Sequence, residues 1–212
     1  IVIKHGEAKF EYTKDENYRD NKLKVGISCG DPNGVGMEVV LKTFADNRLL
    51  DTIVPVLYAH PEWFKQTKKS LRLEEMLYTN VTSAKEAQPK KINLVTVSKD
   101  LPFSIEWGKA DTQGGEWALK SLEVAAQDLA SNAIDVLVTA PINKETISSK
   151  HSGFIGHTEF LAKMAGTEEV LMFLVADDLR VGIVTGHVPI KDVAPKISKP
   201  AKATTPPKGA PK

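Results

Sequence analysis

The chain has 212 residues, of which 42% are hydrophobic and 26% are charged, so it can bury the core of one large domain or two small ones. A formal net charge of +1 creates no field that favours nucleic acid or an acidic membrane, which leaves a small molecule as the expected partner. The single cysteine, Cys29, excludes an internal disulfide framework and fits a reducing compartment. No apolar run reaches the roughly 18 residues that span a bilayer, and the N-terminal segment lacks the apolar stretch of a signal peptide. We therefore expect a globular, cytoplasmic protein.

Residues 1–22 are polar and mix both charge signs, and we expect a loose extension or one edge hairpin there. Strands are then predicted over 23–28, 53–59, 91–97 and 134–140, and they alternate with helices predicted over 37–44, 61–71 and 114–132. Alternating strands and helices imply βαβ crossovers, so the expected fold class is α/β with a mostly parallel sheet and flanking helices. In such sheets ligands bind beyond the carboxyl ends of the strands.

The pattern changes after the last of these strands. Residues 169–186 contain two apolar runs joined at Asp177 and Asp178, a short turn that favours an antiparallel pair. We therefore expect a first α/β domain over 23–143 and the start of a second domain over 144–198. Residues 199–212 are rich in Pro and Lys and lack large apolar side chains, which predicts a disordered tail.

A glycine-rich loop, GDPNGVG at 30–36, joins the first strand to the first helix. Its glycines permit tight turns, and the amide groups of a helix N-terminus attract anions. The alternative is a structural turn in which Asp31 caps the helix. The spacing matches neither a Walker A loop nor a dinucleotide-binding fingerprint. Cys29, which precedes the loop, has no basic neighbour in sequence and is interpreted as a small buried hydrophobe.

Two loops further along carry candidate site residues. Lys144 follows a buried strand, where its charge can reach a ligand, although a plain surface lysine is the alternative. His157 and Thr158 stand side by side before an apolar helix expected from Phe160, and they suit a donor pair for a phosphate or carboxylate. Thr158 and Glu159 could instead simply cap that helix.

His187 follows Gly186 at the end of a predicted strand. A neutral imidazole in this place can bind a metal ion or act as a base. The chain has only five histidines and neither H-x-x-x-H nor H-x-H spacing, so a complete metal site built locally is not expected.

Four segments resemble, in order and spacing, the 4-hydroxythreonine-4-phosphate dehydrogenase family of vitamin B6 biosynthesis: KVGISCGDPNGVGMEVVLKTF, DVLVTAPINKETI, GFIGHTEFLAKMAG and LRVGIVTGHVPIKDVAPKI. The resemblance covers the chain from about Lys22 to Ser198, and the words GHTEF and TGHVPI are specific. It implies a fold like that of isocitrate and isopropylmalate dehydrogenases. It also implies a homodimer with its active site in a cleft between two domains.

The resemblance further implies roles for individual residues. His157 and Thr158 are expected to contact substrate, and His187 to be a ligand of a divalent metal ion such as Zn, Mg or Co. Lys144 is a candidate for supplying charge or a proton near the reacting carbons. NAD(P) would accept the hydride of 4-phosphohydroxy-L-threonine while the metal stabilises the alkoxide, and carbon dioxide would then leave. No residue is assigned to the cofactor.

Members of that family are longer, and their other metal-binding histidines and most cofactor contacts lie downstream of this sequence. We therefore expect a truncated chain that is inactive alone and whose partner is a small phosphorylated substrate rather than nucleic acid or a membrane. Two alternatives remain open. One is a dehydrogenase of a related 4-phospho-sugar acid, and the other is a noncatalytic anion-binding module.

Overall fold

The computed structural model describes residues 22–148, 151, 153–167, 170–176, 178–186 and 188–197. The strands are β1 (Leu23–Ser28), β2 (Ile53–Ala59), β3 (Tyr78–Val81), β4 (Ile92–Thr96), β5 (Val136–Thr139), β6 (Met172–Ala176) and β7 (Leu179–Ile183). The α-helices are α1 (Gly36–Phe44), α2 (Pro61–Ser70), α3 (Thr112–Ala130), α4 (Lys144–Ser148), α5 (His157–Met164) and α6 (Val193–Lys196). Short 3-10 turns are η2 (Asn47–Asp51), η3 (Ala84–Glu86) and η4 (Ile190–Asp192).

Five strands form one parallel sheet in the order β3-β4-β2-β1-β5. The predicted α/β class and mostly parallel sheet are therefore confirmed. Strand β3 was not predicted, because its sequence YTNV holds no apolar run and it pairs only with β4 at the edge of the sheet. Tertiary pairing, rather than local hydrophobicity, makes this segment a strand.

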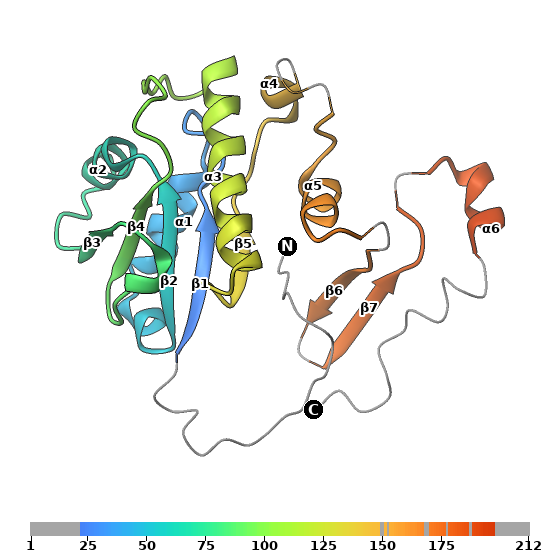
Figure 1. Cartoon of the computed structure of the whole chain (residues 1–212), viewed down its shortest axis with the longest axis horizontal. Coiled ribbons are helices and arrows are strands. Elements are labelled where there is room, and N and C mark those ends of the chain that lie inside the picture. The colour runs from blue at the N-terminus through green and yellow to red at the C-terminus, as the bar shows by residue number, and fades with distance from the viewer. Residues whose placement is uncertain are drawn as a thin grey trace.

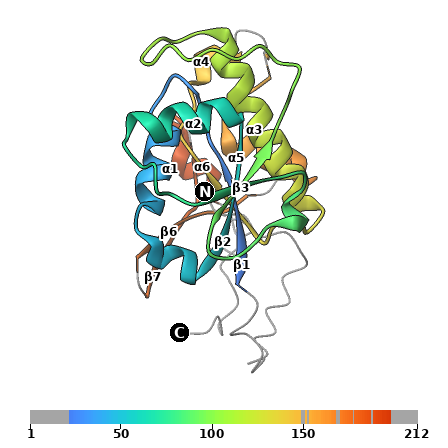
Figure 2. The same ribbon diagram turned by 90° about the vertical axis from the view of Figure 1, so that its left-hand side faces the viewer.

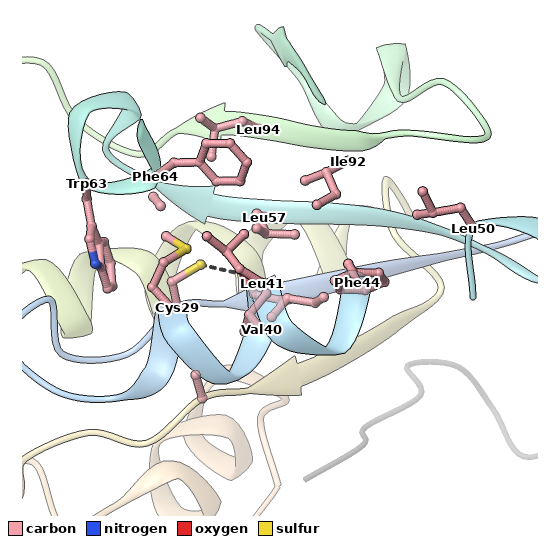
Figure 3. Close-up of a cluster of buried hydrophobic side chains, with 14 residues drawn as sticks. Cys29, Val40, Leu41, Phe44, Leu50, Leu57, Trp63, Phe64, Ile92 and Leu94 are labelled. Atoms are coloured by element: carbon pink, nitrogen blue, oxygen red, sulfur yellow. Dashed lines mark hydrogen bonds between the residues drawn. The ribbon is translucent and has the colours of Figure 1, made fainter. Parts of the chain in front are cut away.

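Helices cover both faces of the sheet. Figure 2 shows α1 and α2 on one side of the strands and α3 on the other. Leu57 of β2 packs toward α1 and α2 with Leu41, Phe44 and Phe64, as Figure 3 shows. The next residue, Tyr58, packs toward α3, because successive side chains of a strand point to opposite faces. Its hydroxyl donates to Asp128 Oδ2 of α3 at 2.8 Å, so this buried phenol is paired.

Helices α4 and α5 extend the layer formed by α3 (Figure 1). Ile147 of α4 is fully buried against Ala118 and Leu119 of α3, and Phe154 and Phe160 pack on the same cluster. Gly115 permits this approach, since a Cβ there would lie 2.5 Å from the backbone carbonyl of Thr146. The start of α4 is thus anchored to the α/β unit, and the division of the chain at residue 144 stays a prediction.

Strands β6 and β7 pair as the predicted antiparallel hairpin, apart from the five-stranded sheet in Figure 1. Nearly all of their residues are exposed, including Leu174 and Val175. The expected N-terminal extension, apart from Lys22, and the expected disordered tail lie outside the described residues. Within the part of the chain that the structure describes, no helix has the length and apolarity needed to cross a membrane.

Candidate functional site

The loops that follow β1 and β5 meet at the carboxyl edge of the sheet. The backbone N–H of Asp31 donates to the carbonyl oxygen of Pro141 at 3.2 Å. Gly30 has a φ of +71°, and a side chain there would collide with the same carbonyl group. Only glycine satisfies both conditions without strain, so the glycine-rich loop fixes the turn that leads into α4.

Asp31 does not cap α1, so that sequence-based alternative was wrong. The N-cap of α1 is Val35 and has no side-chain cap hydrogen bond, whereas Asp31 Oδ1 accepts from the backbone N–H of Asn33 at 2.9 Å. Asn33 Nδ2 in turn donates to Asp111 Oδ2 at 3.1 Å, and Asp111 caps α3 through Gly114. Burial raises the pKa of the Asp31 carboxyl, and the nearby charge of Asp111 adds to that effect, while the bond from Asn33 opposes it. The loop is therefore tied to α3 as well as to β5.

Cys29 is fully buried at the end of β1. Burial raises the pKa of its thiol to about 12, so no useful fraction of thiolate exists at neutral pH. Its interpretation as a small buried hydrophobe is confirmed.

Lys144 is the first residue of α4, and contacts of the neighbouring residues Asn143 and Thr146 fix its backbone. Asn143 Oδ1 accepts from the N–H of Glu145 at 3.0 Å, which caps the helix. The close approach of Gly115 to Thr146 fixes the same turn against α3. The Lys144 side chain itself is exposed, so its ammonium is free to meet a ligand at the carboxyl edge of the sheet.

The start of α5 lies beside Lys144. A Cβ placed on the buried Gly156 would lie 3.4 Å from Lys144 Nζ and 3.1 Å from Glu159 Oε2. Burial lowers the pKa of the half-buried His157 imidazole, and the positive charge of Lys144 lowers it further. The imidazole is therefore held in its neutral form at pH 7. Its Nε2 atom is buried and has no hydrogen-bond partner among the residues that the structure describes.

The alternative in which Thr158 and Glu159 cap the helix was also wrong. The N-cap of α5 is Gly156, which has no side-chain cap hydrogen bond, and the helix begins at His157 rather than at Phe160. Thr158 lies in the first turn and is partly buried. The N–H groups of this first turn, the Thr158 hydroxyl and the Lys144 ammonium bring several donors to one corner, where the Glu159 carboxylate also lies.

His187, the predicted metal ligand, lies outside the described residues. Within the described ranges no three or more His, Cys, Asp or Glu residues gather in a way that could hold a metal ion. Sequence reasoning missed Asn143, Gly115 and the Asn33–Asp111 bond, all of which position the site. The pattern of Asn143 just before a short helix could have revealed the cap, but contacts between distant segments leave no local pattern.

The chain is similar in sequence and in structure to known proteins. The family model of pyridoxal phosphate biosynthetic protein PdxA matches residues 51–205. A 4-hydroxythreonine-4-phosphate dehydrogenase of Bacteroides thetaiotaomicron is 39% identical over 181 residues, which cover 85% of this chain and 49% of that protein. A putative D-threonate 4-phosphate dehydrogenase of Cutibacterium acnes is 32% identical over 181 residues, which cover 82% of this chain and 51% of that protein.

Among solved structures, a 4-hydroxythreonine-4-phosphate dehydrogenase from Burkholderia phymatum is similar with a TM-score of 0.74 at 31% identity. The match covers 86% of this chain and 55% of that one. The chain therefore spans about half the length of the curated relatives and of the solved structure that it matches.

Proposed function

The chain belongs to the family of pyridoxal phosphate biosynthetic protein PdxA, and from this premise we propose that it carries the substrate-binding half of an NAD-dependent dehydrogenase. The proposed reaction of the whole protein is the oxidation, with decarboxylation, of 4-phosphohydroxy-L-threonine in vitamin B6 biosynthesis. The role proposed for this chain is to bind the phosphate of that substrate. The homodimer and the cytoplasmic location expected from the sequence belong to the same proposal.

The observation that carries the proposal is the meeting of Lys144 with the first turn of α5. Lys144 Nζ borders Gly156, and His157 and Thr158 follow directly. A phosphate here would accept from backbone N–H groups, from the Thr158 hydroxyl and from a charged ammonium, and hydrogen bonds to charged groups are the stronger ones. Since His157 is neutral, one ring nitrogen can donate while the other accepts. Its Nε2 is covered from solvent and unpaired among the described residues, so a ligand would reach it only after a small movement of the ring.

The metal and the nicotinamide belong to the proposal only through the resemblance. When bound, a divalent cation would stabilise the substrate alkoxide, and NAD(P) would take up the hydride. His187 is the residue proposed for the metal, but the described residues do not by themselves make a metal site. What Lys144, His157 and Thr158 contribute is binding, orientation and the handling of a proton at the imidazole.

A second candidate substrate is D-threonate 4-phosphate. It is favoured by the relative named as a putative D-threonate 4-phosphate dehydrogenase, which is 32% identical to this chain. Both substrates carry a phosphate on a four-carbon acid, so the corner at Lys144 and α5 would serve either. A noncatalytic anion-binding module would use the same corner without turnover.

The test is calorimetric titration of the purified chain with 4-phosphohydroxy-L-threonine, with D-threonate 4-phosphate and with inorganic phosphate. We expect weak binding of all three, and a loss of about tenfold or more for Lys144→Met, because a charge-assisted hydrogen bond disappears. Lys120→Met is the matched control, since this lysine pairs with Glu123 on α3, away from the corner. Equal affinity in Lys144→Met and in the parent chain would remove the proposed site.

A second measurement separates binding from chemistry. The chain alone should form no NADH from either substrate with NAD and Zn or Mg present, because turnover needs metal, substrate and nicotinamide fixed together. Robust turnover that His187→Ala abolishes would show that this chain is already a complete enzyme. Substrate binding without turnover would fit both the incomplete dehydrogenase and the noncatalytic module.

A further inference from the structure

The start of α1 and the end of α2 line a pocket of about 430 Å³. These two helices cover the face of the sheet opposite to α3 (Figure 2). Its walls come from the glycine-rich loop, the start of α1, the end of α2 and the loop that carries Trp107. Helices α4, which begins at Lys144, and α5 belong to the other side, where Ile147 and Phe160 pack with α3. The pocket is therefore separate from the corner proposed for the substrate phosphate.

Trp107 gives the pocket an exposed aromatic wall. It is 59% exposed, whereas Trp63 and Trp117 are each 1% exposed in the core. Met37 and Leu71 add apolar surface to the lining. An aromatic ring that leaves so much area in water beside apolar side chains suits stacking with another ring.

Thr67 of α2 lines the same pocket and is only 4% exposed. Its hydroxyl oxygen is covered from solvent and has no hydrogen-bond partner among the described residues. A buried hydroxyl without a partner is destabilising, and such groups call for an explanation. Threonine has two accessible χ1 rotamers in a helix, so we expect a change of rotamer on ligand binding to turn this covered hydroxyl toward the pocket.

The start of α1 supplies electropositive groups. Val35, its N-cap, lines the pocket and provides no side-chain cap hydrogen bond, so no side chain occupies the first N–H groups of the helix, two of which belong to the buried Gly36 and Met37. Glu38 also lines the pocket, but Lys42 lies 2.5 Å from its carboxylate and offsets its charge.

We infer that this pocket binds a small aromatic anion, a single ring bearing a phosphate or carboxylate group. The ring stacks on Trp107 over Met37 and Leu71. The acid group accepts from the N-terminal N–H groups of α1, and the Thr67 hydroxyl donates to it. This inference does not depend on the proposed function, because none of these residues borders Lys144 or His157.

The test follows the fluorescence of Trp107 during titration with phenyl phosphate and with benzoate. The two buried tryptophans form a constant background, so quenching reports on the pocket. We expect saturable quenching by at least one of these anions, with phenol and inorganic phosphate about tenfold or more weaker, because each offers only half of the contacts. Inorganic phosphate can still bind at Lys144 without quenching Trp107, which keeps failure of this inference distinct from failure of the proposed function.

Two variants decide the role of Thr67. Thr67→Val keeps the shape and removes the hydroxyl, so we expect affinity for the quenching anion to fall about tenfold while the denaturation midpoint rises. Thr67→Ser keeps the hydroxyl and should keep the affinity. Lys144→Met is the matched control and should leave quenching unchanged. Absence of quenching by both anions, stronger quenching by phenethylammonium, or unchanged affinity in Thr67→Val would each overturn the inference.

Discussion

Two strands of similar apolar sequence, β2 and β6, differ in burial. Strand β2 reads IVPVLYA and is buried from Val54 to Ala59, whereas β6 reads MFLVA and every residue of it is exposed. The difference lies in the cover, because α1 and α2 pack on one face of β2 and α3 packs on the other. A two-stranded hairpin is marginal in water without such cover. An apolar strand sequence thus predicts burial on both faces, but it does not identify the segments that cover those faces.

The largest expected effect comes from removing equal side chains in the two regions. Leu57→Ala should destabilise the protein by about 2–5 kcal/mol, because Leu57 of β2 is fully buried between the sheet and α1. Leu174→Ala should change stability by less than about 0.5 kcal/mol, since Leu174 is 61% exposed. Chemical denaturation followed by far-UV circular dichroism measures both. Comparable losses would mean that the hairpin is covered in solution and that the contrast is wrong.

The next effect concerns the loop that ties β1 to β5. Gly30→Ala should lower the free energy of unfolding by more than the roughly 1–3 kcal/mol expected for a strained positive φ. The excess arises because the new methyl group collides with the Pro141 carbonyl. Gly108→Ala is the matched control, since its φ is +82° but no atom lies within 4 Å of the added Cβ. The difference between the two denaturation midpoints isolates the collision. Equal losses would show that the Pro141 contact contributes nothing to stability.

The architecture could be predicted from the sequence where each segment carries its own pattern. The continuous apolar runs of β1, β2, β4 and β5 can be recognised in the sequence, and so can the three- and four-residue apolar spacing of α3. Strand β3 could not be predicted, because only its pairing with β4 makes it a strand. The wrong cap at Asp31 has a local cause instead, since its carboxylate accepts from the Asn33 N–H two residues on rather than from the start of α1.

The candidate site was predictable as a set of residues but not as a geometry. The sequence predicted Lys144 just beyond a strand end, and His157 with Thr158 as a donor pair before a helix expected from Phe160. Lys144 borders Gly156, and the segment before and after it is approached closely by two other glycines, Gly30 at Pro141 and Gly115 at Thr146. Those contacts join segments far apart in sequence, and a single sequence carries no record of them.

A smaller effect on stability, but a direct one on surface chemistry, is expected in the hairpin. Leu174→Lys combined with Leu179→Lys should lower the fluorescence of the dye ANS, because both side chains are more than 60% exposed and form part of an apolar surface. The unfolding free energy should stay within about 0.5 kcal/mol for each change. Val39→Lys on α1, 52% exposed, is the control and should leave most dye binding intact. Dye binding that is unaffected by the double change would place the apolar surface elsewhere.

The smallest expected effect is a pH dependence within the five-stranded unit. Burial lowers the pKa of His60, Lys65 lowers it further, and Glu62 opposes the shift, while the imidazole stacks on Phe103 at 4.3 Å. Between this lowered pKa and the ordinary value of 6.5, the unfolded chain binds more protons than the folded one, so stability rises with pH and falls on acidification. The unfolding free energy should therefore decrease from pH 7 to pH 5.5.

His60→Asn keeps a residue suited to the N-cap of α2 but cannot titrate, so it should reduce this slope even though the lost stacking lowers stability at every pH. An unchanged slope in His60→Asn would assign the acid sensitivity to another group, with His157 the next to test because burial also lowers its pKa.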